Sequence, residues 1–159
     1  EYRKRMLEAF PIHPQIIDVL YNRWNLLQNF QRTRHVLTFL SVVLKNLKEK
    51  GDREDVILCG SIDLSDTKIK SLVKQFLNEE KWESVIKEDI VEHATEIDKL
   101  SKSENRYAKR LSTTIFMFTA PTIPLREEIR ERGVTLKEIL PSVISLNLET
   151  STALSLIHI

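Results

Sequence analysis

Residues 10–44, FPIHPQIIDVLYNRWNLLQNFQRTRHVLTFLSVVL, predict two helices joined by a short, aromatic-rich bend. In the second helix, expected over residues 31–48, apolar residues recur at steps of three and four and mark one buried face. These residues are Val36, Phe39, Leu40, Val43 and Leu47. Arg34 falls on a different stripe, with Thr38, Ser41 and Lys45, which points away from that core. Because a packed helix holds its first turn in place, Arg34 is the leading candidate for a positioned functional cation.

The first helix of this pair is predicted to begin at Pro14, because the fixed φ of proline suits a first helical position. Its apolar face is expected to contain Ile16, Ile17, Leu20, Tyr21 and Trp24. His13 precedes the helix, and a histidine between prolines at such a place is more often a capping or packing residue than a base or a ligand. Gly51 is a predicted C-terminal cap for the second helix.

The rest of the chain is also mainly helical in pattern. Amphipathic helices are predicted over residues 66–78, 82–100 and 106–118, a short one over 124–132, and a capping box at Thr135 and Glu138. Residues 55–64 are the best strand candidate. The apolar run over 113–119 fits a helix or a buried strand, and we favour the helix. The predicted fold is therefore mainly α, with at most a short strand near residues 55–64.

Composition excludes several function classes. The 159-residue chain is 42% hydrophobic and 30% charged, with a net charge of +1, so it has no overall electrostatic attraction to nucleic acid or anionic lipid. It contains neither a phosphate-binding glycine loop nor a metal-ligand spacing, so the chain alone is not expected to be an enzyme. A single cysteine, Cys59, and the lack of a signal or membrane segment favour a reduced, cytoplasmic setting.

Both ends of the sequence indicate a piece of a larger protein. The chain begins Glu-Tyr-Arg-Lys without an initiator methionine, and residues 2–9 have the pattern of a helix already under way. Residues 154–159, LSLIHI, are similar to what the transposon-end adaptor of sequencing libraries encodes. We expect these six residues to be a cloning or assembly scar, the alternative being a genuine apolar tail.

Four segments carry a resemblance to a known family: FPIHP-QIIDVLYNRW, NFQRTRHVLTFLSVVL, IDL-x-x-x-x-IK and RLSTTIFMF. Over residues 10 to about 140 the chain resembles large bacterial AAA+-like P-loop ATPases, formerly of unknown function, which are found beside DNA-methyltransferase and helicase genes in phage-defence islands. The resemblance implies a helical lid-type bundle, with residues 1–50 as the lid and 51–150 as a downstream, mainly helical segment. ATP with Mg²⁺ would be bound by a nucleotide-binding core upstream of this chain and not by the fragment alone. Its implied partners are that core, other defence-island proteins and DNA, and no membrane.

The resemblance also implies roles for two arginines. Arg34, in Arg34-His35-Val36-Leu37, is similar to the sensor-2 arginine of AAA+ lids, which appears as Arg-x-x-Leu and contacts the γ-phosphate; the family pattern has glycine where His35 stands. The alternative is a surface arginine with a salt-bridge partner. Arg32 lies nearer the apolar edge, so we favour a structural ion pair for its side chain. Nucleotide binding is the alternative role.

A second hypothesis comes from another class. Residues 55–118 are also compatible with a non-catalytic, winged-helix-like module that binds DNA or protein, with Lys68, Lys70 and Lys74 facing phosphate. Salt-dependent binding of duplex DNA would favour this hypothesis over the lid.

Overall fold

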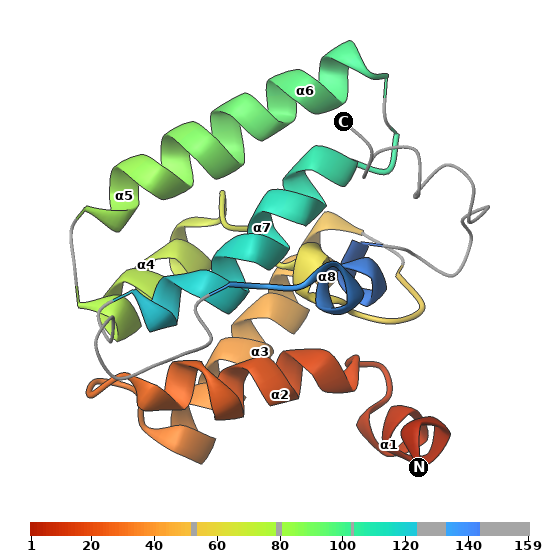
Figure 1. Cartoon of the computed structure of the whole chain (residues 1–159), viewed down its shortest axis with the longest axis vertical. Coiled ribbons are helices and arrows are strands. Elements are labelled where there is room, and N and C mark those ends of the chain that lie inside the picture. Colours follow the sequence, from red (N-terminus) through yellow and green to blue (C-terminus); the bar gives the residue numbers. More distant parts are fainter. Residues whose placement is uncertain (52–53, 79–80, 103, 124–132, 144–159) are drawn as a thin grey trace.

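The computed structural model describes residues 1–51, 54–78, 81–102, 104–123 and 133–143, and these residues form a bundle of helices (Figure 1). The helices are α1 Tyr2–Ala9, α2 Pro14–Asn22, α3 Arg32–Lys50, α4 Thr67–Leu77, α5 Trp82–Ser84, α6 Ala94–Leu100, α7 Tyr107–Thr119 and α8 Leu136–Val143. A π-helical stretch, Val85–His93, joins α5 to α6. The mainly α fold class is confirmed. Within the described residues, no helix is both long enough and apolar enough to cross a lipid bilayer.

Helix α3 buries the face that its sequence predicts. Val36, Phe39, Leu40, Val43 and Leu47 are all buried, while Arg34, Thr38, Ser41 and Lys45 are exposed. The helix ends at Gly51, whose φ of 67° lets its N–H reach the carbonyls of Leu47 and Lys48. Of the residues predicted for the buried face of α2 and the turn after it, Ile16, Leu20 and Trp24 are buried, Ile17 is half-buried and Tyr21 is 39% exposed, while Val19 is also buried.

An aromatic cluster joins the segment between α2 and α3 to α3 and α4. Trp24, Phe30, Phe39 and Phe76 are each at most 5% exposed, and the rings of Phe30 and Phe76 meet edge to face at 5.0 Å. The indole Nε1–H of Trp24 donates to the carbonyl of Met117 at 2.8 Å, which ties this cluster to α7. The aromatic cluster near the N-terminus and α7 therefore belong to one hydrophobic core.

Residues 55–64 do not form a strand. Ile57 makes one isolated bridge to Ile12, and the chain then enters a 3₁₀ turn, Cys59–Ser61. At Gly60 this turn approaches α7 and α8 so closely that an added Cβ would lie 2.6 Å from the Ser142 carbonyl oxygen. The β-branched composition of the segment reflects burial between helices rather than pairing in a sheet.

Helix α5, the π-helical stretch and α6 form one continuous rod that runs alongside α7 (Figure 1). Its buried residues repeat every fourth position: Trp82, Ile86, Ile90, Ala94 and Asp98. The wider π-helical turn moves the buried face forward by one residue, because its hydrogen bonds run from i to i+5. Asp98 is consequently buried, and its neighbour Ile97 is 55% exposed.

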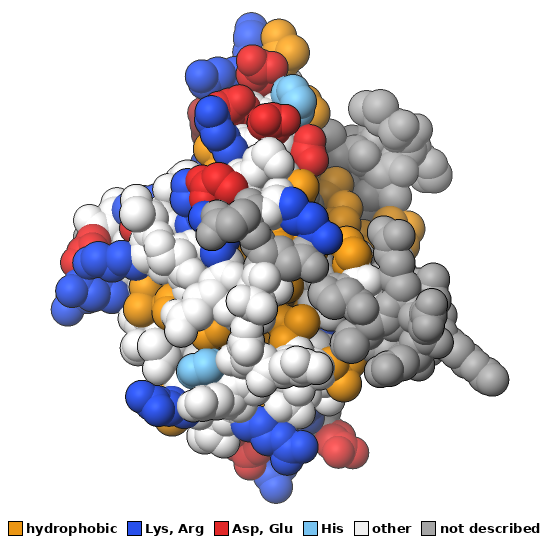
Figure 2. Space-filling model, turned by 90° about the vertical axis from the view of Figure 1, so that its left-hand side faces the viewer, with side chains coloured by type: hydrophobic (Ala, Val, Ile, Leu, Met, Phe, Trp, Pro, Cys, Tyr) orange, Lys and Arg blue, Asp and Glu red, His pale blue; other side chains and the backbone are white. Residues whose placement is uncertain are grey.

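The outer face of this rod is charged. Acidic, basic and histidine side chains gather at the upper end of the space-filling view (Figure 2). The exposed members include Lys87, Glu88, Asp89, Glu92, His93 and Glu96.

Helix α7 occupies the middle of the bundle and settles the ambiguous apolar run at 113–119 as helical. It packs against α6, α8 and the turn Cys59–Ser61. At the start of α8, the N–H of Thr135 donates to Glu138 Oε2 at 2.8 Å, which confirms the predicted capping box. The predicted helix over 124–132 and the expected scar at 154–159 lie outside the described residues.

His13 is a capping residue, and this makes the fold sensitive to acid. Its Nδ1 accepts the N–H of Gln15 at 3.2 Å, and its Nε2 lies 2.9 Å from the hydroxyl of Tyr2. Burial lowers the pKa of His13 below its ordinary value of 6.5, against a smaller opposing effect of Asp18. The folded state thus favours the neutral ring. The unfolded chain binds more protons below pH 6.5, so this contribution to stability is present above that pH and is lost as the pH falls.

We therefore expect the melting temperature to fall between about pH 7.5 and about pH 5, and to fall less in a His13→Asn variant, which keeps an N-cap without a titrating group. Thermal unfolding followed by circular dichroism at the two pH values measures this. Identical pH profiles for the two proteins would contradict the assignment.

Candidate functional site

The first turn of α3 holds Arg34 exposed on a fixed backbone. The Arg34 carbonyl accepts the hydroxyl of Thr38 at 2.9 Å, whereas the guanidinium has no hydrogen bond or ion pair within the described part of the chain. On the opposite, buried face of the same helix, Val36 and Phe39 are 4% and 1% exposed. The side chain therefore projects from the exposed face of a helix whose opposite face is buried, as expected from its stripe.

Arg32 has a different environment. Its Nε–H donates to Asn25 Oδ1 at 3.2 Å, which links the start of α3 to the 3₁₀ turn Trp24–Leu26. The partner is a neutral amide, so the expected ion pair is wrong for the described residues. The physical reason is spatial: the turn before α3 brings an amide, not a carboxylate, within reach.

His35 braces the same turn. Its Nδ1 accepts the N–H of Gln31, the N-cap residue, at 2.9 Å. Its ring stacks on Phe76 at 4.8 Å and meets the edge of Phe30 at 5.7 Å. His35 therefore satisfies one of the unpaired N–H groups of the helix end and holds the first turn of α3 against the core.

The charges of this turn oppose the helix dipole. Arg32 and Arg34 both lie in the first turn, and no acidic residue accompanies them there. A cation at a helix N-terminus is unfavourable by about 0.3–1 kcal/mol. Helix stability alone does not explain two arginines at this position, whereas an anionic ligand would.

A partly buried ion cluster at the other end of α3 was missed by the sequence reasoning. Arg110 Nη1 donates to Glu54 Oε1, and the hydroxyl of Ser61 donates to Glu54 Oε2. The ammonium groups of Lys50 and Lys109 both contact Asp63, the latter at 2.9 Å. These six residues join α3, the 54–63 segment and α7. The available signal was Arg110 itself, a charged residue on the α7 stripe that also contains Tyr107, Thr114 and Met117, all buried.

The lysines proposed for DNA contact are largely engaged within the fold. Lys70 and Lys74 donate to the two oxygens of Glu83 at 2.7 and 2.8 Å, and Lys68 is exposed. The two ammonium groups lower the pKa of Glu83 to about 2. This pairing ties α4 to α5, so two of the three lysines act as structural partners.

Cys59 carries no chemistry in this fold. It is 1% exposed, and burial raises the pKa of its thiol to about 12. The thiolate needed for nucleophilic attack is therefore disfavoured.

Comparison with known proteins identifies the family of this domain. The family model described as the DUF499 second domain matches residues 1–148. The chain belongs to this family. Every helix of the DUF499 second domain described above, from α1 to α8, lies within the match. The comparisons with curated proteins and with solved structures gave no match.

Proposed function

We propose that this DUF499 second domain is the helical lid, with the segment that follows it, of a larger defence-associated AAA+-like ATPase. In this proposal Arg34 senses the bound nucleotide. The observation that supports it is an exposed guanidinium, with no partner among the described residues, on a helix turn that is braced by His35 and buried at Val36. The family description "second domain" and the sequence resemblance both support a preceding domain in the same protein.

The chemistry of the guanidinium fits this role. Its planar N–H groups form charge-assisted, bidentate hydrogen bonds with phosphate oxygens. ATP, held with Mg²⁺ by the upstream core, presents a γ-phosphate to the lid, and ADP does not. A contact made only with the triphosphate couples hydrolysis to movement of the lid, because the ligand then binds the two states with different affinities. The protein would act in the cytoplasm.

The described residues give less support to the alternative of a DNA-binding module. A winged-helix reader needs cations that face the duplex, and Lys70 and Lys74 instead share Glu83. The lid remains the function that the geometry supports best.

Arg34→Ala in the full-length protein is expected to slow ATP hydrolysis by about tenfold or more, since a hydrogen bond to a charged group is worth about 1.5–3 kcal/mol. Arg32→Ala is the matched control, because it removes the same charge from the same turn but contacts only Asn25. Steady-state phosphate release measures both variants, with melting temperatures to verify folding. Equal rates for the two variants would contradict the sensor role.

A further inference from the structure

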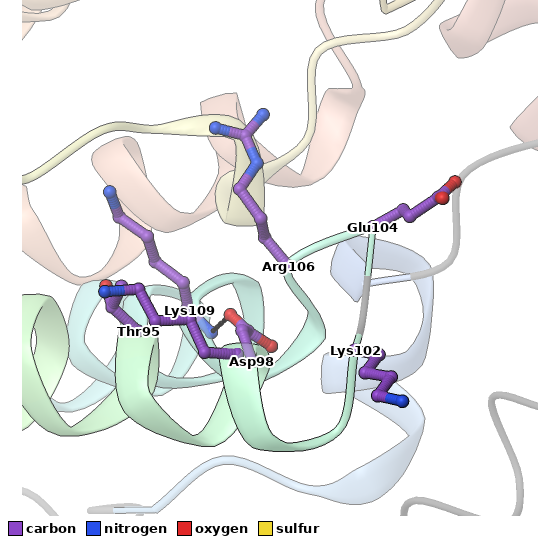
Figure 3. A pocket seen from close by; sticks show the side chains of 7 residues that line it. Thr95, Asp98, Lys102, Glu104, Arg106 and Lys109 are labelled. Atoms are coloured by element: carbon purple, nitrogen blue, oxygen red, sulfur yellow. Dashed lines mark hydrogen bonds between the residues drawn. The ribbon is translucent and has the colours of Figure 1, made fainter.

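The carboxylates of two aspartates cap helices elsewhere in this fold. Asp98 on α6 accepts two N–H groups of α7 at 2.8 and 3.0 Å (Figure 3), and Asp66 accepts two of α4 at 2.9 and 3.0 Å. The start of α3 is built differently, because its N-cap residue, Gln31, makes no capping hydrogen bond with its side chain. The first turn of α3, which carries Arg34, therefore depends on another group for its order.

His35 supplies that group. Its Nδ1 accepts the N–H of Gln31, and its own N–H donates to the carbonyl of Gln31, both at 2.9 Å. These two hydrogen bonds close a ring around residues 31–35, and Arg34 lies within it. Because Nδ1 is an acceptor here, the imidazole that caps α3 is neutral, with its proton on Nε2.

The imidazole is also anchored to the core. It stacks on Phe76 of α4, with ring centroids 4.8 Å apart and planes inclined by 26°, and it meets the edge of Phe30 at 5.7 Å. Phe76 and Phe30 are both buried. Fraying of the first turn would break these aromatic contacts together with the cap, so the backbone at Arg34 is held by two independent sets of contacts.

A neutral cap differs from a carboxylate in its effect on Arg34. A carboxylate at the same place would be favoured by the helix dipole, but it would pair with the guanidinium and repel an approaching phosphate. The first turn of α3 contains no acidic residue, and Arg34 has no ion-pair partner within the part of the chain that the structure describes. His35 thus orders the turn and leaves the guanidinium available to an anion.

We propose that His35 is the positioning residue of the nucleotide sensor: a neutral cap that fixes the turn under Arg34 without competing with the nucleotide for its guanidinium. This role rests on the proposed function, since it concerns how Arg34 is presented to the γ-phosphate. It requires an uncharged hydrogen-bond acceptor at position 35, which the role of Arg34 alone does not.

Two isosteric variants of the full-length protein test this requirement. His35→Asn keeps a neutral acceptor close to the position of Nδ1, and His35→Asp places a carboxylate there. We expect His35→Asp to bind ATP about fivefold or more weakly than His35→Asn, which is the effect of one charge at about 4 Å in water. Its melting temperature should be at least as high, because a carboxylate stabilises a helix N-terminus, so the weaker binding would not reflect a weaker fold. Equilibrium binding of ATP and of ADP measures the affinities, and ADP, which lacks the γ-phosphate, should be affected less.

His35→Phe tests the cap itself, because it keeps a ring against Phe76 and removes the acceptor. We expect faster hydrogen exchange at the Gln31 amide, measured by mass spectrometry on peptides that span residue 31, and ATP binding weakened by about fivefold. The matched control is Thr135→Ala, which removes the capping hydroxyl of α8 instead. Its affinities for both nucleotides should equal those of the parent.

Equal ATP affinity in His35→Asp and His35→Asn, unchanged exchange at Gln31 in His35→Phe, or equal weakening of ATP binding in Thr135→Ala would each overturn the positioning role. A lost preference for ATP in Arg34→Ala would still support the lid in those cases. A preference that Arg34→Ala leaves unchanged would instead overturn the sensor itself, and the role of His35 with it.

Discussion

Replacing Trp24 by alanine is expected to lower the free energy of unfolding by about 3–5 kcal/mol. The side chain is 1% exposed, and its ring contacts those of Phe30 and Phe76 at 6.4 Å. Its removal leaves a cavity in the aromatic cluster and also an unpaired carbonyl at Met117. Because small domains are stable by only about 5–15 kcal/mol, this single change removes a large share of the total.

Urea unfolding measures the effect. Tyr21→Ala is the control, because Tyr21 is an aromatic residue on α2 that is 39% exposed, and its loss should cost less than about 1 kcal/mol. Trp24→Phe retains the ring but not the N–H donor, so an intermediate loss is expected and keeps the test informative if the alanine variant does not fold. A loss below about 1 kcal/mol for Trp24→Ala would contradict its place in the core.

Replacing Glu54 by alanine is expected to cost about 3–5 kcal/mol, because it leaves the buried guanidinium of Arg110 without its carboxylate. The side chains of Arg110 and Glu54 are 9% and 18% exposed. Ser61, which donates to the other oxygen of Glu54, would lose its acceptor as well.

The double variant Glu54→Leu/Arg110→Met distinguishes the net contribution of the ion pair to stability from the penalty of leaving one buried charge unpaired. Replacing both charges with apolar groups of similar size is often close to neutral, so the double variant should be more stable than Glu54→Ala. Urea unfolding of the parent, of Glu54→Leu and Arg110→Met alone, and of the double variant gives the coupling energy. A Glu54→Ala protein as stable as the parent would show that the cluster is solvated rather than buried.

The elements predicted correctly from the sequence depend on local physics. The buried face of α3, the Gly51 cap and the Thr135–Glu138 box each follow from residues within one or two helical turns of one another. The exposure of Arg34 follows from the same periodicity, and the structure confirms it.

The features that the sequence did not predict depend on distant partners. The 3₁₀ turn at Cys59–Ser61 exists because α7 and α8 press against Gly60, and the Glu54–Arg110 pair joins residues 56 positions apart. Because of the π-helical stretch, Asp98 and not its apolar neighbour Ile97 is buried, and the Asp98 carboxylate caps α7. Arg34 is the opposite case: its position is local and was predicted, while the phosphate that it is proposed to contact would come from another domain.

The preference of the full-length protein for ATP over ADP tests the sensor proposal most directly, because only a γ-phosphate contact distinguishes the two ligands. Equilibrium binding of both nucleotides to the parent, Arg34→Ala and Arg32→Ala proteins measures it. We expect Arg34→Ala to weaken ATP binding by about tenfold or more with ADP binding unchanged, and Arg32→Ala to alter neither. An unchanged ATP-to-ADP ratio in Arg34→Ala would contradict the proposal.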